Sequence, residues 1–154
     1  MSEWEALLRV ALALAAGALL GLEREVADKP AGLRTYALVA QGSGLFMVLG
    51  ILLSGQNYGG NATIDPSRIA STVVQGIGFI AGGVIFTVGA RVQGLTTAAG
   101  VWVAAAAGLL IGGGFYIVGF GAIVLSLVVL RVLGYVGRKL PTDQGALHRR
   151  DVSD

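Results

Sequence analysis

The sequence predicts an all-α membrane protein with five transmembrane helices, and three observations lead to this fold class. Hydrophobic residues make up 55% of the 154 residues and charged residues only 13%, about half the charged share of a soluble domain. The mean hydropathy is +0.76. Glycine contributes 25 residues, which membrane helices tolerate because glycine lets their backbones approach closely. A soluble protein of this length exposes too much surface to hide such apolar content, so lipid must be part of its solvent.

Five stretches are long and apolar enough to cross the hydrocarbon core, which takes roughly 17–25 residues. The connections between them are short, and those between the last three are the shortest, so two tight antiparallel pairs are expected. Together the stretches form one transmembrane domain over residues 1–140, followed by a polar cytoplasmic tail over 141–154. The five predicted spans are Trp4–Leu22, Arg34–Leu53, Ile69–Val88, Leu95–Ile111 and Phe115–Gly137.

The distribution of positive charge predicts the orientation of these spans. Five spans place the termini on opposite sides, and cytoplasmic segments carry the excess of Lys and Arg. With a cytoplasmic C-terminus, the periplasmic side keeps only Arg9 and Arg68. The N-terminus is therefore expected to be periplasmic. The cytoplasmic side then collects Arg24, Lys29, Arg34, Arg91, Arg131, Arg138, Lys139, Arg149 and Arg150.

Composition also argues against several functions. The chain has no cysteine, and its one histidine, His148, lies in the polar tail, so thiolate chemistry, a catalytic triad and a histidine metal site are not expected. A net charge of +2 is too small to indicate a nucleic-acid partner. We expect no enzymatic activity, no catalytic residue and no cofactor.

Small residues repeat at the helical spacing that brings two membrane helices into contact. In the third span, Gln75, Gly78, Gly82 and Ile85 share one face with a polar group at one end. The sequence leaves three readings of this face open: packing within the bundle, a dimer seam, or a pathway lined by backbone carbonyls. The glycines expected to serve helix packing are Gly17, Gly21, Gly76, Gly78, Gly82, Gly83, Gly94, Gly108 and Gly112.

Opposite charges adjoin in the turn between the first two spans. Arg24 can pair with Glu23, Glu25 or Asp28, and a Pro-Ala-Gly turn brings Arg34 and Thr35 back toward them. Exposed pairs contribute only about 0–1 kcal/mol, whereas partly buried charges near the membrane boundary are costly unless paired. An ion pair between Glu23 and Arg34 is the favoured hypothesis, with solvated charge at a helix end as the alternative.

Asp65 and Arg68 lie directly before the third span. Asp65 is expected to be a helix N-cap, with Pro66 in the first helical position. The alternative is a cation ligand, because hard cations prefer carboxylate oxygen; Asp65 and Glu23 are the weak candidates for such a site. Arg9 is expected to pair with Glu5 four residues earlier, and a pair with Asp65 is the alternative.

The fourth span begins with two hydroxyl residues, Thr96 and Thr97, either of which can cap the helix. Trp102 lies two turns inside that span. A buried indole N–H needs an acceptor, so Trp102 is expected to face protein rather than lipid.

Four blocks in this order resemble the MgtC/SapB family of bacterial inner-membrane proteins. The resemblance covers roughly residues 14–114 and is carried by their combination, since none is decisive alone. The blocks are Gly21-Leu22-Glu23-Arg24 with Ala31-Gly32-Leu33-Arg34-Thr35; Arg68-Ile69-Ala70; Gly76-Ile77-Gly78-Phe79-Ile80 with Gly83-Val84-Ile85; and Val92-Gln93-Gly94-Leu95-Thr96-Thr97-Ala98-Ala99 with Trp102.

The resemblance implies a multi-pass protein of the bacterial inner membrane with a periplasmic N-terminus. It also implies a role in magnesium homeostasis and an association with virulence. Some family members have asparagine at the position of Thr96. Some carry a cytoplasmic ACT-like domain, and this chain is expected to be a short form without it.

Three classes of function follow. The favoured one is a regulatory protein that adapts the cell to magnesium limitation or host stress by packing against another membrane protein. The second is a transporter or channel subunit for magnesium, protons or a small solute, and the third is a structural membrane protein. The expected partners are the lipid bilayer, a second copy in a homo-oligomer (a dimer is favoured) and another membrane protein.

Overall fold

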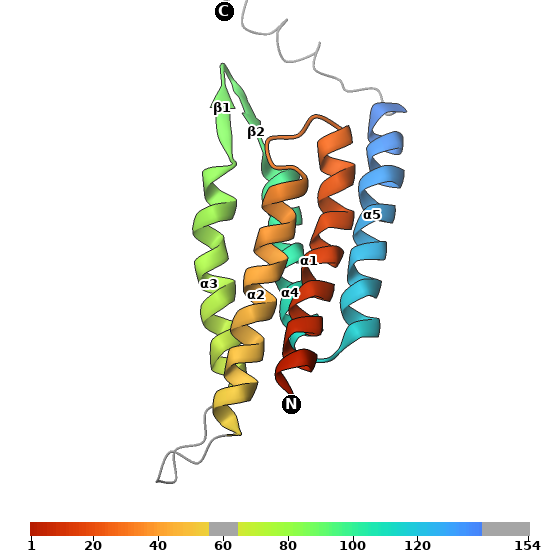
Figure 1. The fold of residues 1–154 in the computed structure, drawn as a ribbon. Helices are drawn as coiled ribbons and strands as arrows, with labels where there is room; N and C mark the ends of the chain where they lie inside the picture. The colour runs from red at the N-terminus through yellow and green to blue at the C-terminus, as the bar shows by residue number, and fades with distance from the viewer. Residues whose placement is uncertain (56–64, 140–154) are drawn as a thin grey trace, which may run out of the picture.

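Five helices run side by side in the part of the chain that the computed structural model describes, residues 1–55 and 65–139 (Figure 1). The predicted tail and most of the loop between the second and third helices lie outside these residues. The helices are α1 (Glu3–Val26), α2 (Leu33–Ser54), α3 (Pro66–Gly83), α4 (Leu95–Gly112) and α5 (Tyr116–Lys139), and a short hairpin of β1 (Phe86–Val88) and β2 (Arg91–Gln93) joins α3 to α4.

Four of the helices, α1, α2, α4 and α5, are long and apolar enough to cross a membrane. Each covers the corresponding predicted span to within four residues at either end. The remaining helix, α3, is 18 residues long and more polar, because its first ten residues include Ser67, Arg68, Ser71, Thr72 and Gln75.

The third predicted span, Ile69–Val88, is wrong at its C-terminal end. Helix α3 stops at Gly83, and the apolar run that follows forms β1, which pairs with β2 in antiparallel register. Gly89, with φ +61°, occupies the turn, a conformation that glycine adopts without steric cost. A β-hairpin therefore joins α3 to α4, where the predicted spans leave only a short connection over residues 89–94.

The core of the bundle lies between α1, α2 and α4, each of which packs against the other two. Helix α5 covers one side of this trio, and α3 packs against α2 and α4 on the other (Figure 1). Most of the buried positions are small. The fully buried members include Ala13, Ala16, Tyr36, Ala40, Val101, Ala104, Ala107 and Ile111.

Glycine brings the backbones of the core helices into direct contact. Gly17 of α1 lies against the carbonyl oxygen of Tyr36, and Gly108 of α4 lies against that of Ala40. Gly21 and Gly112 continue these contacts one turn further along their helices. Such close approach increases the dispersion contacts between helices, which matter in lipid because burial gives little hydrophobic gain there.

Candidate functional site: a buried polar cluster at one end of the core

An ion pair is buried near the C-terminal end of α1. The guanidinium of Arg24 donates two hydrogen bonds to the carboxylate of Glu23, with Nε 2.5 Å from Oε2 and one terminal nitrogen 2.9 Å from Oε1. The side chains are only 6% and 13% exposed, respectively. Two parallel bonds between planar groups give a strong and directional contact, so each charge neutralises the other where water is scarce.

Tyr36 stands beside this pair, within electrostatic reach of both charges. Its side chain is fully buried and fits a slot left by glycines, because Gly21 lies against its Cβ and Gly100 against its ring. Its hydroxyl donates a hydrogen bond of 3.0 Å to the backbone carbonyl of Thr97. The cluster therefore ties α2 to the first turn of α4.

Tyr36 was not among the residues singled out from the sequence. Its position in the first turn of an apolar helix, directly after Arg34 and Thr35, is also typical of a tyrosine at the membrane interface. Only its contacts with Gly21 and Gly100 in the folded chain show that Tyr36 is buried in the core rather than placed at the interface.

Removing the Tyr36 hydroxyl tests the link between α2 and α4. Tyr36→Phe keeps the ring in its slot and removes one hydrogen bond, so we expect the free energy of unfolding to fall by about 1 kcal/mol. Unfolding titrations in mixed micelles measure this loss. Tyr116→Phe is the control, since the hydroxyl of Tyr116 has no hydrogen-bond partner within the described residues; equal effects of the two variants would contradict the assignment.

The hypothesis of an ion pair between Glu23 and Arg34 is wrong. Both carboxylate oxygens of Glu23 are taken by Arg24, and Arg34 is exposed on the outer side of α2. The carboxylate that reaches α2 is that of Glu25, whose Oε2 accepts a hydrogen bond of 2.9 Å from the backbone N–H of Leu33. Glu25 thus satisfies one of the free N–H groups at the start of α2, which suits the positive end of the helix dipole.

The residues predicted at the start of α4 take different roles. Neither Thr96 nor Thr97 caps the helix: Gly94 holds the N-cap position with φ +87° and no side-chain cap. Thr97 is buried and Thr96 is exposed. Trp102 is 47% exposed, contrary to the expectation that it faces protein, because it shares the outward face of α4 with Leu95 and Ala99.

Two further polar groups lie at the opposite end of the bundle. Arg9 pairs with Glu5 at 2.6 Å, as predicted, and also donates a hydrogen bond of 3.2 Å to the carbonyl of Gly112, the last residue of α4. It therefore places a cation at the negative end of the α4 dipole.

The capping role predicted for Asp65 is confirmed. One carboxylate oxygen accepts from the backbone N–H of Ser67 and the other from its hydroxyl, each at 2.8 Å. These bonds hold the pKa of the Asp65 carboxyl below its usual range, because they favour the ionised form.

Asp65 lies at the start of α3 and Glu23 at the far end of α1 (Figure 1), so the two candidate metal ligands do not share a site. No group of three His, Asp or Glu side chains that could hold a metal occurs in residues 1–55 and 65–139.

The glycines of α3 behave differently from those of the core. A Cβ atom added at Gly76, Gly78, Gly82 or Gly83 would meet nothing within 4 Å. Gln75 and Ser71 are exposed beside Gly78 and Gly82 on one face of the helix. This face therefore does not pack inside the bundle, in contrast to the faces of Gly17, Gly21, Gly108 and Gly112.

Comparison with known proteins identifies a family and several relatives of this chain. The chain matches the model of the MgtC family over residues 10–139. It is 44% identical over 133 residues to an Escherichia coli (strain K12) protein named "Putative magnesium transporter YhiD", with 83% of this chain and 60% of that protein covered. It is 43% identical over 115 residues to "Protein MgtC" of Brucella abortus (strain 2308), with 72% and 45% covered.

A third relative is "Protein SapB" of Bacillus subtilis (strain 168), 35% identical over 150 residues with 95% of this chain and 63% of that protein covered. The chain thus spans less than two thirds of the length of these relatives. No solved structure matches it. The family model covers most of the chain, including the buried cluster and the core helices, and the chain belongs to the MgtC family.

Proposed function

We propose that this chain is a five-span protein of the bacterial inner membrane that regulates another membrane protein during magnesium limitation or host stress. In this proposal it is not an enzyme. It acts through helix packing and works as a homo-oligomer, with a dimer favoured.

The placement of charge supports five spans with a periplasmic N-terminus. The turn after α1 with the helix ends that flank it, the β-hairpin and the C-terminal part of α5 lie at one end of the bundle (Figure 1). They carry Arg24, Lys29, Arg34, Arg91, Arg131, Arg138 and Lys139. Helix α3 runs alongside α2 although it is more polar (Figure 1), which supports counting it as the fifth span. The positive-inside rule then assigns the cation-rich end to the cytoplasm.

The position of the ionisable groups is the observation that carries the regulatory proposal. Carriers coupled to ions usually keep an ionisable residue near the middle of the membrane. Among the described residues, the charged side chains in the helices lie toward the helix ends. The least exposed arginines pair within the chain, Arg24 with Glu23 and Arg9 with Glu5. An arrangement of fixed pairs is suited to holding a bundle in shape rather than to loading and releasing an ion.

The outer face of α3 supports assembly with a second copy. Ser71 and Gln75 are exposed there beside the open Gly78 and Gly82, and a polar group facing lipid is costly unless it finds a hydrogen bond. A primary amide both donates and accepts, so Gln75 of one copy complements Gln75 of another across a two-fold axis. Open glycines allow the two α3 backbones to meet.

Transport of magnesium or protons is the second candidate. The name of the Escherichia coli relative favours it, as does the presence of a buried carboxylate, Glu23, at one end of the core.

Reconstituted protein separates the two candidates. With the chain in liposomes that enclose a magnesium-sensitive or a proton-sensitive dye, the regulatory proposal predicts the same flux as in protein-free liposomes. Cross-linking of the same preparation should yield a dimer, which Gly78→Leu should diminish because leucine keeps the α3 backbones apart.

Gly121→Leu on α5 is the matched control for cross-linking, because a Cβ at Gly121 also meets nothing within 4 Å. A flux that grows with protein density, and that disappears in a folded Glu23→Gln variant, would establish transport in place of regulation.

A further inference from the structure

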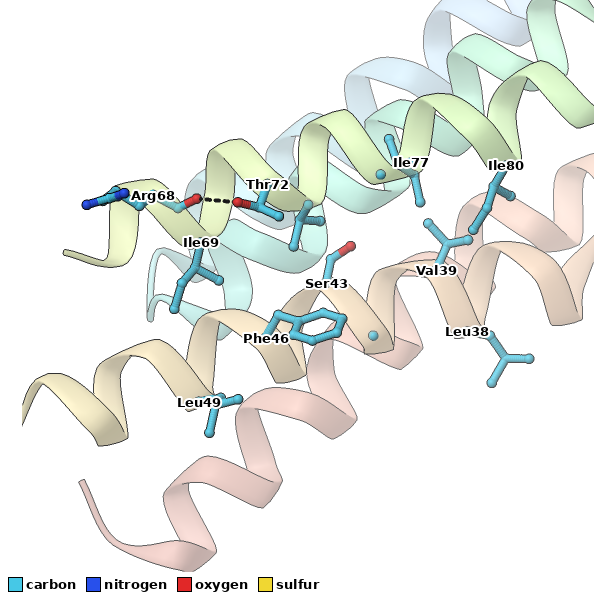
Figure 2. A pocket seen from close by; sticks show the side chains of 13 residues that line it. Leu38, Val39, Ser43, Phe46, Leu49, Arg68, Ile69, Thr72, Ile77 and Ile80 are labelled. Atoms are coloured by element: carbon cyan, nitrogen blue, oxygen red, sulfur yellow. Dashed lines mark hydrogen bonds between the residues drawn. The ribbon is translucent and has the colours of Figure 1, made fainter. Parts of the chain in front are cut away.

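A groove of about 710 Å³ runs between α2 and α3. Figure 2 shows side chains of both helices, among them Ser43, Phe46 and Ile69, in the space between them, with Arg68 at the end where α3 begins. The groove lies apart from the buried cluster and from the outer face of α3. Its α3 wall includes Ile69, Val73, Ile77 and Ile80, which fall on the opposite side of that helix from Ser71, Gln75, Gly78 and Gly82 at 100° per residue.

The walls of the groove are apolar. Phe46 and Leu49 of α2, both about half exposed, line the groove together with Ile69 and Ile77 of α3. The buried hydroxyl of Ser43 and that of Thr72 also reach the lining, but Thr72 already donates to the carbonyl of Arg68 at 3.0 Å. Water gains few hydrogen bonds in such a space, and an empty groove forfeits dispersion contacts along both helices. An apolar chain lying in the groove would restore these dispersion contacts without leaving a polar group unpaired.

The length of the groove matches one leaflet of a bilayer. Its lining on α3 extends from Arg68 to Ile80, which is about 18 Å at 1.5 Å per residue. On α2 it extends from Leu38 to Leu49, about 17 Å. Half of the hydrocarbon core measures about 15 Å, so an acyl chain that starts near Arg68 would follow the groove to its far end.

The end of the groove at Arg68 carries an exposed positive charge. Arg68 is exposed, and it makes no ion pair within residues 1–55 and 65–139. Asp65, its closest acidic neighbour in sequence, lies within electrostatic reach of Arg68 but directs both carboxylate oxygens to Ser67. Arg9, the other arginine at this end of the bundle, is paired with Glu5. Within the described residues, Arg68 is thus the cation that lies at this end of the groove, where it can attract an anionic lipid headgroup.

We propose that the groove between α2 and α3 binds one phospholipid, with an acyl chain along the apolar walls and the headgroup phosphate against Arg68. The site prefers an anionic phospholipid, because a net negative headgroup gains more from the guanidinium than a zwitterionic one. The proposal is independent of the regulatory role and of the orientation, and it rests only on α2 and α3 both lying in the bilayer.

Two groups of variants test the site while leaving the bundle intact. A Cβ atom added at Gly42 or Gly76 meets nothing within 4 Å, and both glycines line the groove, so Gly42→Leu and Gly76→Leu fill it without displacing a helix. Arg68→Gln removes the charge at its mouth. The matched controls are Gly121→Leu, which is equally open but on α5, and Arg131→Gln, an exposed cation of α5.

The measurement is native mass spectrometry of the protein extracted from vesicles of phosphatidylglycerol and phosphatidylethanolamine in equal amounts. The unmodified chain should retain one lipid per copy, mostly phosphatidylglycerol. Either groove-filling leucine should abolish that retention, and Arg68→Gln should lower the preference for phosphatidylglycerol by about fivefold, the equivalent of one exposed ion pair. The controls should match the unmodified chain.

Two results would overturn the proposal. One is lipid retention that the leucine variants leave unchanged. The other is a lipid-free dimer that dissociates in Gly76→Leu but not in Gly78→Leu, since a helix of a second copy would then occupy the groove. A flux measurement has no bearing on either result, so failure here and failure of the proposed function are distinguishable.

Discussion

Arg24→Met is expected to lower the free energy of unfolding by about 3–5 kcal/mol. Arg24 is only 5% exposed, and it supplies both hydrogen bonds shown for the Glu23 carboxylate. Without the guanidinium, Glu23 must remain charged in a poorly hydrated place or take up a proton, and either outcome costs free energy. Titration with a denaturing detergent, followed by tryptophan fluorescence, measures the loss.

Two further variants make this prediction specific to a buried pair. Arg34→Gln removes an exposed cation only ten positions away and should change stability by no more than about 0.5 kcal/mol. The double variant Glu23→Gln/Arg24→Met removes both charges, so most of the lost stability should return. If Arg24→Met behaved like Arg34→Gln, the pair would not be buried in the native bundle.

The sequence predicts the helices whose apolar length is their main signal. The predicted fourth span, Leu95–Ile111, differs from α4 by one residue, because a glycine stands at each end. The predicted fifth span, Phe115–Gly137, is similarly close to α5. Inside lipid every backbone N–H and C=O group needs a hydrogen bond, and for a single apolar segment only the helix provides all of them.

The length of the apolar run gives a wrong prediction at the C-terminal end of α3. The run Val84–Val88 is apolar, and hydropathy treats it as a continuation of the span. Its β-branched and aromatic residues also suit a strand, and the two glycines before it, Gly82 and Gly83, weaken the helix. Hydropathy does not distinguish these two structures, so the β-hairpin could be found only from the three-dimensional fold.

The candidate site shows a different limit to what can be predicted from the sequence. The sequence predicts an ion pair at the turn after the first span, because a charge near lipid is costly unless it is paired. It does not determine which carboxylate turns inward, since Glu23 and Glu25 are two residues apart on one helix. In the structure Glu23 pairs with Arg24 while Glu25 reaches the start of α2, and this division depends on how closely α1 and α2 approach each other at Gly21.

The contrast between two sets of glycines could not be read from spacing either. Gly78 and Gly82 have the same four-residue spacing as Gly108 and Gly112, yet only the second pair contacts another helix within the bundle. Spacing shows that a face is smooth, and it leaves open whether the surface opposite is a helix of the same chain, another chain or lipid.

Gly108→Leu is expected to destabilise the bundle strongly, because Gly108 lies against backbone rather than against a side chain. A Cβ atom there would meet the carbonyl oxygen, carbonyl carbon and Cα of Ala40, and none of these can turn aside. Helix α4 would have to move away from α2 and give up neighbouring contacts. We expect a loss of about 3 kcal/mol in the free energy of unfolding, at the upper end of overpacking effects, measured by detergent titration.

Alanine substitutions separate this steric cause from a general intolerance of the bundle to glycine replacement. Alanine has the higher helix propensity, by about 1 kcal/mol, so Gly134→Ala on α5, where a Cβ meets nothing within 4 Å, should leave stability equal or higher. Gly108→Ala should lower it, because its single added carbon already collides with Ala40. Opposite signs for one chemical change are expected only if contact between the backbones of α2 and α4 holds the core together, and equal signs would refute that contact.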